Sequence, residues 1–504
     1  MSIDEMLCRG AQRFPEKTAI YFENSEITYS QLDSEVDSLA SGLLELGLQH
    51  QKMVGLLLGN NPDFVRSYFA ITRAGGVVVP INPLYKDEEV KYLLNQAGAV
   101  FLITTLSLLP LIQRVWGDLP TLQKVIVIGG ETGERVVSYG ELLAKITKPV
   151  EIAIKMDDTA ACLFTSGTTG KPKGALLSHG NLAFDVQAST KRIQMTPDDK
   201  HLCVLPLFHS FALMATMLCP LYTGSSIVIV PQFHPDLVLQ AISSKKVTIF
   251  CGIPAMFASV LSAPEKDSYD LKSLHLCASG GAPAPVELLQ AFEDKYNVII
   301  LEGDGPTETS PVAYVNPVEL RKIGSVGPPL DGVRVKIVDE ADRELLVGEI
   351  GEICIQGPNV MQGYLNQPEA TAEAMKGGWF HTGDMGKVDE DGYIYIMDRK
   401  KDMIIVGGLN VYPREIEDCL SKHPGVAETA VIGMPDELRG EIPLALIVRK
   451  PGVKATPEEF TLFCRKHLAN YKCPRQVIFI DSLPRTTTGK VDKKYLRKEY
   501  DTIR

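Results

Sequence analysis

The hydrophobic positions in the first third of the chain alternate between helical spacing and short apolar runs. Thr28 and Gln31 have capping-box spacing, and they precede five apolar residues at helical intervals, namely Leu32, Val36, Leu39, Leu43 and Leu46. Predicted strands at 54–58, 77–79 and 100–103 then alternate with predicted helices at 63–73 and 88–96. Later apolar runs at 227–230, 248–250, 274–278 and 298–301 continue the pattern. The alternation predicts an α/β fold with parallel-rich sheets covered by helices.

The pattern changes after Gly332, where glycine-punctuated strands dominate, and it changes again after the charged run 398–402. From there Pro413 opens a predicted helix, and Thr456 to Glu459 has the sequence of a second capping box. We predict a large N-terminal domain at 1–397 with a β-rich subdomain at about 332–397. A hinge at 398–402 and a small mobile α+β C-terminal domain at 403–504 follow.

Composition and charge exclude several classes of protein. The chain has 504 residues, of which 45% are hydrophobic and 22% charged, so disordered, collagen-like and small disulfide-rich proteins are excluded. The net charge of −11 argues against a nucleic-acid-binding protein. Residues 399–504 carry 20 Lys and Arg against 14 Asp and Glu, or +6, which leaves −17 for the rest. The small basic domain is expected to approach an anionic ligand, although uneven surface charge without function remains an alternative.

The cysteines and the N-terminal sequence favour a cytoplasmic protein. The ten cysteines form no C-x-x-C pair, which predicts buried reduced thiols and leaves a structural zinc site without its usual spacing. The N-terminal residues lack the apolar region of a secretory signal. The longest apolar stretch, 211–230, contains Pro220 and Gly224, so it predicts a buried helix, a turn and a strand instead of a transmembrane segment.

The strongest local motif is a glycine- and hydroxyl-rich loop that follows the apolar run 160–164. Its glycines allow close approach of the backbone to phosphate oxygens, and its hydroxyl and lysine side chains add donors. The spacing differs from that of a Walker A loop. The loop consists of Thr165, Ser166, Gly167, Thr168, Thr169, Gly170, Lys171, Pro172, Lys173 and Gly174.

This loop resembles the phosphate-loop signature of the adenylate-forming superfamily, which comprises acyl-CoA synthetases, luciferase and peptide-synthetase adenylation domains. Further segments resemble motifs of that family in the same order along nearly the whole chain: 205–210, 279–283, 303–308, 379–384, 398–413 and 484–490. The sequence of the segment 398–413 is most similar to that of bacterial fatty acyl-CoA ligases.

The resemblance implies an acid–thiol ligase that uses ATP, Mg²⁺ and coenzyme A. A carboxylate would attack the α-phosphate of ATP to give an acyl adenylate, and a thiol would then displace AMP. The predicted acyl pocket at 208–217, 251–256, 280–281 and 310–314 is apolar and contains no cationic residue. A medium- or long-chain fatty acid is therefore expected. An aryl acid, a carrier-protein acceptor, luciferase-like oxidation and a non-catalytic relative are the alternatives.

The resemblance also implies roles for single residues. Glu308 would bind Mg²⁺ together with Thr168, Thr307 would contact phosphate, and Lys490 would serve adenylation. His209 would border the acyl channel, although a buried structural histidine is the alternative. Lys490 would act in the first half-reaction only, after which the C-terminal domain would rotate and present Gly407 and Gly408 to the thiol.

The remaining implied contacts are to the nucleotide. Asp304 departs from the family, which usually has an aromatic residue there to stack on adenine. The implied nucleotide-binding residues are those of the phosphate loop, with Gly280, Gly281, Ala282, Pro283, Asp304, Gly305, Asp384, Arg399 and Lys401. The expected partners are small molecules and no nucleic acid. We expect a monomer or a homodimer. No transmembrane segment is expected, while peripheral contact with a membrane is left open.

Overall fold

The computed structural model describes residues 1–145, 149–165, 172–264, 266–436, 438–486 and 489–500. The chain divides into two compact units. Unit 1 comprises Met1–Arg334 and Ile355–Phe380, and unit 2 comprises Val335–Cys354 and His381–Arg504. Both units mix helices with sheets, which confirms the predicted fold class. The domain boundary near residue 398 and the hinge at 398–402 remain predictions.

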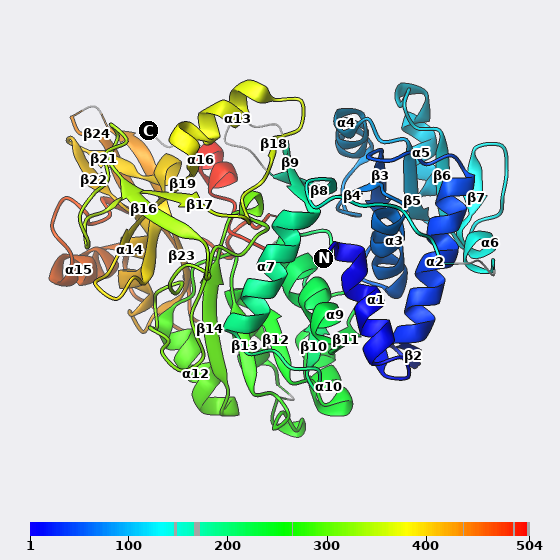
Figure 1. Cartoon of the computed structure of the whole chain (residues 1–504). Helices are drawn as coiled ribbons and strands as arrows, with labels where there is room; N and C mark the ends of the chain where they lie inside the picture. The colour runs from blue at the N-terminus through cyan, green and yellow to red at the C-terminus, as the bar shows by residue number, and fades with distance from the viewer. Residues whose placement is uncertain (146–148, 166–171, 265, 437, 487–488, 501–504) are drawn as a thin grey trace. The chain divides into compact units, whose positions relative to one another are not determined.

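Two eight-stranded sheets form the framework of unit 1. Most neighbouring strands in the first sheet are parallel, and α2 (Tyr29–Glu45), α3 (Pro62–Arg73) and α4 (Asp87–Ala97) lie beside it (Figure 1). The predicted helices and strands of the first hundred residues are thus confirmed. In spatial order the strands are β18 (Gly363–Tyr364), β9 (Lys173–Ser178), β8 (Thr159–Thr165), β4 (Val77–Pro80), β3 (Met53–Leu57), β5 (Phe101–Thr105), β6 (Lys124–Ile128) and β7 (Val136–Ser138).

The second sheet of unit 1 has a parallel centre and an antiparallel strand at each edge. Its helices include α7 (His179–Arg192), α10 (Pro235–Lys245), α11 (Pro254–Ser262) and α12 (Val286–Tyr296). The four later apolar runs are strands of this sheet, as predicted. In spatial order the strands are β15 (Tyr314–Val315), β14 (Ile299–Asp304), β13 (Leu276–Ser279), β12 (Ile249–Gly252), β10 (Lys200–Cys203), β11 (Ser226–Ile229), β1 (Thr18–Phe22) and β2 (Ser25–Thr28).

The long apolar stretch folds as a helix, a turn and a strand, as expected. A π-helical segment at Leu213–Leu218 separates α8 (Ser210–Ala212) from α9 (Cys219–Thr223). Gly224 ends α9 at a φ of 83°, a conformation that glycine adopts without strain, and β11 follows. The π-helical turn was not predicted, because hydrophobic period does not separate α from π winding. Within the described part of the chain, no helix combines the length and apolarity needed to cross a membrane.

Unit 2 contains a four-stranded sheet and a five-stranded sheet. The first has the order β16 (Arg334–Val338), β17 (Gly351–Gln356), β19 (Phe380–Val388) and β20 (Ile394–Arg399), where Arg334, Ile355, Gln356 and Phe380 belong to unit 1. The second consists of β22 (Leu409–Val411), β21 (Ile404–Val406), β24 (Gly440–Arg449), β23 (Val426–Asp436) and β25 (Gln476–Phe479). The helices of this α+β unit are α14 (Pro413–Ser421), α15 (Pro457–His467) and α16 (Lys493–Tyr500).

The two predicted capping boxes have different outcomes. Thr28 accepts a hydrogen bond from the backbone N–H of Gln31, whose side chain accepts one from the N–H of Thr28, so the first box is confirmed. Thr456 is the N-cap of α15, but its side chain makes no capping hydrogen bond, so the second prediction is wrong. Pro457 occupies the first turn as predicted. All ten cysteines are free, and nine are buried.

Candidate active site

The two sheets of unit 1 bring Thr165 and Glu308 together. Thr165 is the last residue of β8, and Glu308 lies in a short 3₁₀ turn, Thr307–Thr309, that follows β14. The Thr165 hydroxyl donates to Oε1 of Glu308 at 3.4 Å. The carboxyl ends of parallel strands are the usual place for ligands in open α/β sheets. Two segments predicted to bind phosphate and Mg²⁺ therefore meet at one carboxylate.

The phosphate loop itself is described only at its two ends. Thr165 pairs with Lys173 across the antiparallel strands β8 and β9, so the ends of the loop are held side by side. The predicted residues Ser166, Gly167, Thr168, Thr169, Gly170 and Lys171 lie outside the described residues.

Glu308 has a second hydroxyl partner that the sequence did not reveal. Tyr364, on β18, donates its hydroxyl to Oε1 of Glu308 at 2.8 Å. The ammonium group of Lys173 lies 5.1 Å from the centre of the Tyr364 ring. Tyr364 is separated from Glu308 by 56 positions, and no local spacing pattern links the two residues. Only the pairing of β18 with β9 could have suggested this contact.

The His209 segment contacts Thr307 through the neighbouring residue Ser210. The hydroxyls of Ser210 and Thr307 are 3.0 Å apart. His209 is the N-cap of α8, where its Nδ1 accepts the backbone N–H of Phe211 at 3.3 Å. The His209 segment thus lies beside the Thr307–Glu308 turn. The capping bond gives His209 a structural role, and its place at the border of an acyl channel remains a prediction.

The predicted nucleotide-binding segment 279–283 begins where β13 ends. A Cβ atom on Gly280 would lie 3.0 Å from the carbonyl oxygen of Gly303 and 3.3 Å from the ring of Phe211. Gly281 has a φ of 73°, which favours glycine. Gly280 therefore lets the ring of Phe211 and the end of β14 approach the loop. Ala282 is half-buried and Pro283 is exposed.

Gly305 is required by backbone contacts. A Cβ atom at this position would overlap the carbonyl oxygen of Pro311 and lie 2.6 Å from the backbone nitrogen of Ala313. We expect Gly305→Ala to lower the free energy of unfolding by about 1–3 kcal/mol, because backbone atoms cannot move aside as a flexible side chain would. Gly117→Ala, where a Cβ meets nothing within 4 Å, is the matched control. Equal stability of the two variants in urea unfolding would contradict this account.

Asp304 is the last residue of β14 and is half-buried. Its backbone carbonyl accepts from Ala313 at 3.1 Å, which fixes its position next to the Thr307–Glu308 turn. We expect Asp304→Tyr to tighten ATP binding roughly 5- to 150-fold, because a base stacked on a ring gains about 1–3 kcal/mol. Isothermal titration of ATP, with Asp304→Asn as the control, measures this. Unchanged affinity would show that position 304 does not hold the base.

In unit 2, the predicted nucleotide-binding residues Asp384 and Arg399 form an ion pair. They face each other across the antiparallel strands β19 and β20, and Arg399 Nε lies 2.9 Å from Asp384 Oδ1. The Asp384 side chain is 7% exposed, and Thr382 accepts its backbone N–H at 3.0 Å. Two residues predicted to bind the nucleotide are thus brought together within one unit.

The hinge segment is held by Asp398. Its carboxylate accepts the backbone N–H groups of Arg399 at 2.7 Å and Arg414 at 2.9 Å. Burial raises the pKa of Asp398, and Lys493 opposes that shift. Burial lowers the pKa of Lys401. These contacts order the segment that was predicted to act as a hinge, while its motion remains a prediction.

Gly407 and Gly408 form the two-residue turn between β21 and β22. Their φ values of 59° and 84° are those of a hairpin turn that requires positive φ at both central positions. The hairpin turn therefore explains why both residues are glycines. A role next to a thiol remains a prediction.

Lys490 lies in a loop closed by an isolated bridge between Arg485 and Val491. Its carbonyl accepts the N–H of Thr486 at 2.8 Å, and its side chain is exposed. The loop fixes the backbone of Lys490 and leaves the long side chain on the surface of unit 2. This geometry is compatible with a lysine that reaches toward a ligand.

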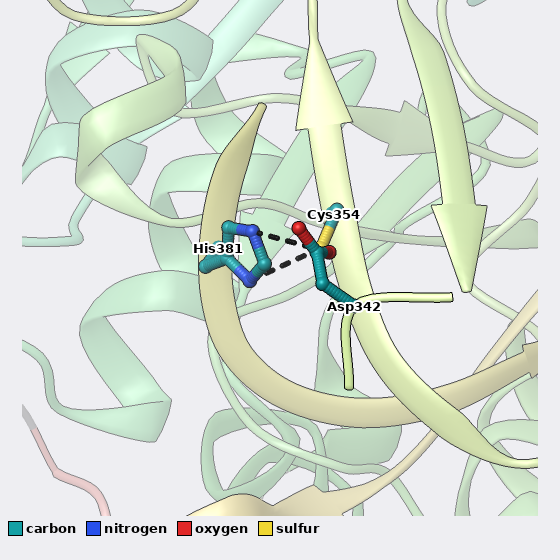
Figure 2. Close-up of side chains that lie close together, drawn as sticks. All are labelled: Asp342, Cys354 and His381. Carbon is teal, nitrogen blue, oxygen red and sulfur yellow. Dashed lines mark hydrogen bonds and ion pairs between the residues drawn. The ribbon is translucent and has the colours of Figure 1, made fainter. Parts of the chain in front are cut away.

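His381 belongs to a cluster that the sequence did not predict (Figure 2). Its Nδ1 lies 3.4 Å from Sγ of Cys354, and its Nε2 lies 3.7 Å from Asp342. Lys336 lies 3.6 Å from Asp342, which places a competing cation beside these potential metal ligands. We interpret the cluster as a contact network that positions β19, the strand that carries Asp384.

Comparison with known proteins covers almost the whole chain. The AMP-binding enzyme family matches residues 7–365, and its C-terminal domain matches residues 415–490. A long-chain-fatty-acid–CoA ligase of Bacillus subtilis (strain 168) is 36% identical, covering 99% of this chain and 94% of the relative. A feruloyl-CoA synthase of Amycolatopsis is also 36% identical, covering 98% of each chain. The crystal structure of an anthranilate CoA ligase with anthranoyl-AMP has a TM-score of 0.93 and 32% identity, covering 99% of this chain and 97% of that one.

These matches agree with the site geometry, since motif segments that are distant in sequence meet at the Thr307–Glu308 turn in unit 1 and at the Asp384–Arg399 ion pair in unit 2. The extent of the match is well beyond a shared fold. The chain therefore belongs to the AMP-binding enzyme family, the adenylate-forming superfamily that its motifs predicted.

Proposed function

We propose that the chain is an ATP-dependent, AMP-forming acid–thiol ligase that converts a hydrophobic carboxylic acid to its coenzyme A thioester through an acyl adenylate. The observation that carries the proposal is the meeting of the phosphate loop's end with the Thr307–Glu308 turn at one carboxylate. The relatives' names support it, because each of those compared above is a ligase or synthase of CoA thioesters.

The donor set around Glu308 fits Mg²⁺. This hard cation is usually held by one or two carboxylates together with substrate phosphates. The Glu308 residue is 9% exposed, and both of its hydroxyl donors bond the same oxygen, Oε1. The magnesium ion would neutralise charge that develops on the phosphates of ATP. Glu308 would supply the protein ligand, and Thr168 remains a predicted second contact outside the described residues.

The other residues divide the work between binding and electrostatics. Thr165, Thr307 and Lys173 supply hydroxyl and ammonium donors for phosphate oxygens, and Asp384 accepts from ribose hydroxyls. Lys490 would place a positive charge where the carboxylate attacks. No general base is needed in the first step, because a carboxylic acid is already ionised near neutral pH. His209 therefore has a shaping role next to the acyl channel.

A medium- or long-chain fatty acid is the proposed substrate. Within the predicted pocket segments, 212–217 and 251–252 are largely buried and apolar. Asp185 contacts the segment 310–314, because its Oδ2 accepts the N–H of Val312 at 3.0 Å. Burial raises the pKa of Asp185 well above its ordinary value, which disfavours a negative charge at this position. The Bacillus relative acts on long-chain fatty acids by its name, whereas the Amycolatopsis relative is named for an aryl acid.

An AMP-release screen tests this function. ATP, Mg²⁺ and CoA are supplied with straight-chain acids of graded length and with benzoate, cinnamate and ferulate, and the thioester is identified by mass spectrometry. We expect AMP and an acyl-CoA, with the highest kcat/KM for a medium or long alkyl chain. If the highest kcat/KM is found with an aryl acid, the substrate is an aryl acid and not a fatty acid. Absence of AMP with every acid would overturn the ligase proposal.

The acceptor is tested in the same assay. CoA is exchanged for a phosphopantetheine-loaded carrier protein, while pyrophosphate exchange reports adenylation alone. We expect product only with CoA. Thioester formed on the carrier and not on CoA would support the stand-alone adenylation enzyme instead.

A further inference from the structure

Tyr364 is held by its backbone next to the phosphate loop. It pairs with Ala175 on β9, and the neighbouring N–H groups of Gln362 and Leu365 donate to Leu176 and Gly174 at 2.9 and 2.8 Å. Its own N–H donates to the hydroxyl of Thr371 at 2.8 Å. The strand that begins at Lys173, where the loop ends, therefore fixes the position of the Tyr364 side chain.

The side chain of Tyr364 has two neighbours that matter for a phosphate-bound cation. Its hydroxyl donates to Glu308 Oε1 at 2.8 Å, the same oxygen that accepts from Thr165 at 3.4 Å. Lys173 lies 5.1 Å from the centre of its ring. The backbone carbonyl of Glu308 accepts the N–H of Met361, three residues before Tyr364, at 2.8 Å. The tyrosine segment thus holds both the main chain and the carboxylate of Glu308.

These hydrogen bonds to Oε1 determine the orientation of the second carboxylate oxygen of Glu308, Oε2. Among the described residues, the side-chain hydrogen bonds of Glu308 all lie on Oε1. The terminal torsion of a glutamate is broad, so a carboxylate without such bonds samples many orientations. A phenol also leaves the full negative charge on the carboxylate, whereas a lysine or arginine at this place would compete with a metal ion.

We propose that Tyr364 is a positioning residue: its hydroxyl fixes the Glu308 carboxylate so that Oε2 meets the divalent cation of the metal–ATP complex. The lysine over its ring keeps the phenol in place and puts a positive charge at the end of the phosphate loop. Groups that orient a metal ligand typically change metal affinity 10- to 100-fold when removed. The inference rests on the proposed function, because it takes Glu308 as a metal ligand.

Tyr364→Phe tests the proposal, since it removes the hydroxyl and keeps the ring over which Lys173 lies. The readout is binding of Mn²⁺ in the presence of ATP, followed by electron paramagnetic resonance. We expect the apparent Mn²⁺ affinity to fall about 10-fold. Adenylation should slow at low metal concentration and recover at high concentration, while thioester formation from supplied acyl adenylate stays unchanged. Unaltered Mn²⁺ affinity in a folded variant would overturn the proposal.

A matched control and a double variant separate positioning from general damage. Tyr395 in unit 2 also donates to a carboxylate, Asp389 at 3.3 Å, and has Lys387 5.7 Å from its ring centre. Tyr395→Phe should leave Mn²⁺ affinity unchanged. In a Glu308→Gln background, Tyr364→Phe should weaken Mn²⁺ binding no further, because the two residues act through one ligand. Additive losses would contradict the positioning role.

The outcome is distinguishable from failure of the function itself. If the wild-type chain releases no AMP with any acid but Tyr364→Phe still weakens Mn²⁺–ATP binding, the metal site stands and the ligase proposal fails. If the wild type forms acyl-CoA and Tyr364→Phe binds Mn²⁺ as tightly as the wild type, the positioning proposal fails and the function stands.

Discussion

Glu308→Gln is expected to slow acyl-adenylate formation by about 100- to 1000-fold, the effect typical of removing one electrostatic group from a transition state. The substitution removes the negative charge and little else. Its amide oxygen can still accept from Tyr364 and Thr165, which now bond Oε1 at 2.8 and 3.4 Å. We therefore expect the fold to be retained and the loss to fall on metal-dependent chemistry.

Single-turnover release of pyrophosphate, measured at saturating ATP, reports this step. Thermal unfolding of the variant serves as the control for fold, and supplied acyl adenylate tests the second half-reaction. A variant with unchanged melting temperature and wild-type pyrophosphate release would show that Glu308 does not bind the catalytic cation.

Lys490→Ala is expected to slow adenylation by about 100-fold or more and to leave thioester formation from supplied acyl adenylate unchanged. A single lysine charge at the attacking carboxylate acts only while the adenylate forms. The family resemblance assigns it that step alone, since the C-terminal domain would then rotate about the hinge and present another face to the thiol. The loop between Arg485 and Val491 fixes its backbone independently of the side chain.

Lys494→Ala is the matched control, because Lys494 is another exposed lysine of the same basic segment, on α16. We expect it to leave both half-reactions at wild-type rates. Equal slowing of the two half-reactions by Lys490→Ala would contradict the division of labour between them. Such a result would also remove the main reason for a mobile C-terminal domain.

Local pattern predicted the framework of unit 1 well. The leucine and valine spacing after Thr28 marks α2, and the capping box at Thr28 and Gln31 is formed as predicted. Thr456 fails as a side-chain cap although its sequence has the same pattern. A capping box needs a side-chain rotamer as well as a spacing, and the sequence fixes only the spacing.

The candidate site was predicted in its parts but not in its connections. Thr165, Thr307 and Glu308 were found from motifs, because Thr165 ends a strand and the Thr307–Glu308 turn follows another. Tyr364 was missed, since its contact with Glu308 depends on the pairing of β18 with β9 and not on any local pattern. The cluster of Asp342, Cys354 and His381 was not predicted for the same reason. Contacts between distant segments come from topology, which motif spacing does not encode.

The most direct test of the account uses an acid whose carboxylate carries oxygen-18. Attack of the carboxylate on the α-phosphate of ATP transfers one carboxylate oxygen to AMP when the thiol later displaces the adenylate. With the acid preferred in the screen, ATP and CoA, we expect AMP that contains one oxygen-18 atom, formed together with acyl-CoA. Unlabelled AMP, or ADP and phosphate in place of AMP and pyrophosphate, would contradict the acyl-adenylate mechanism.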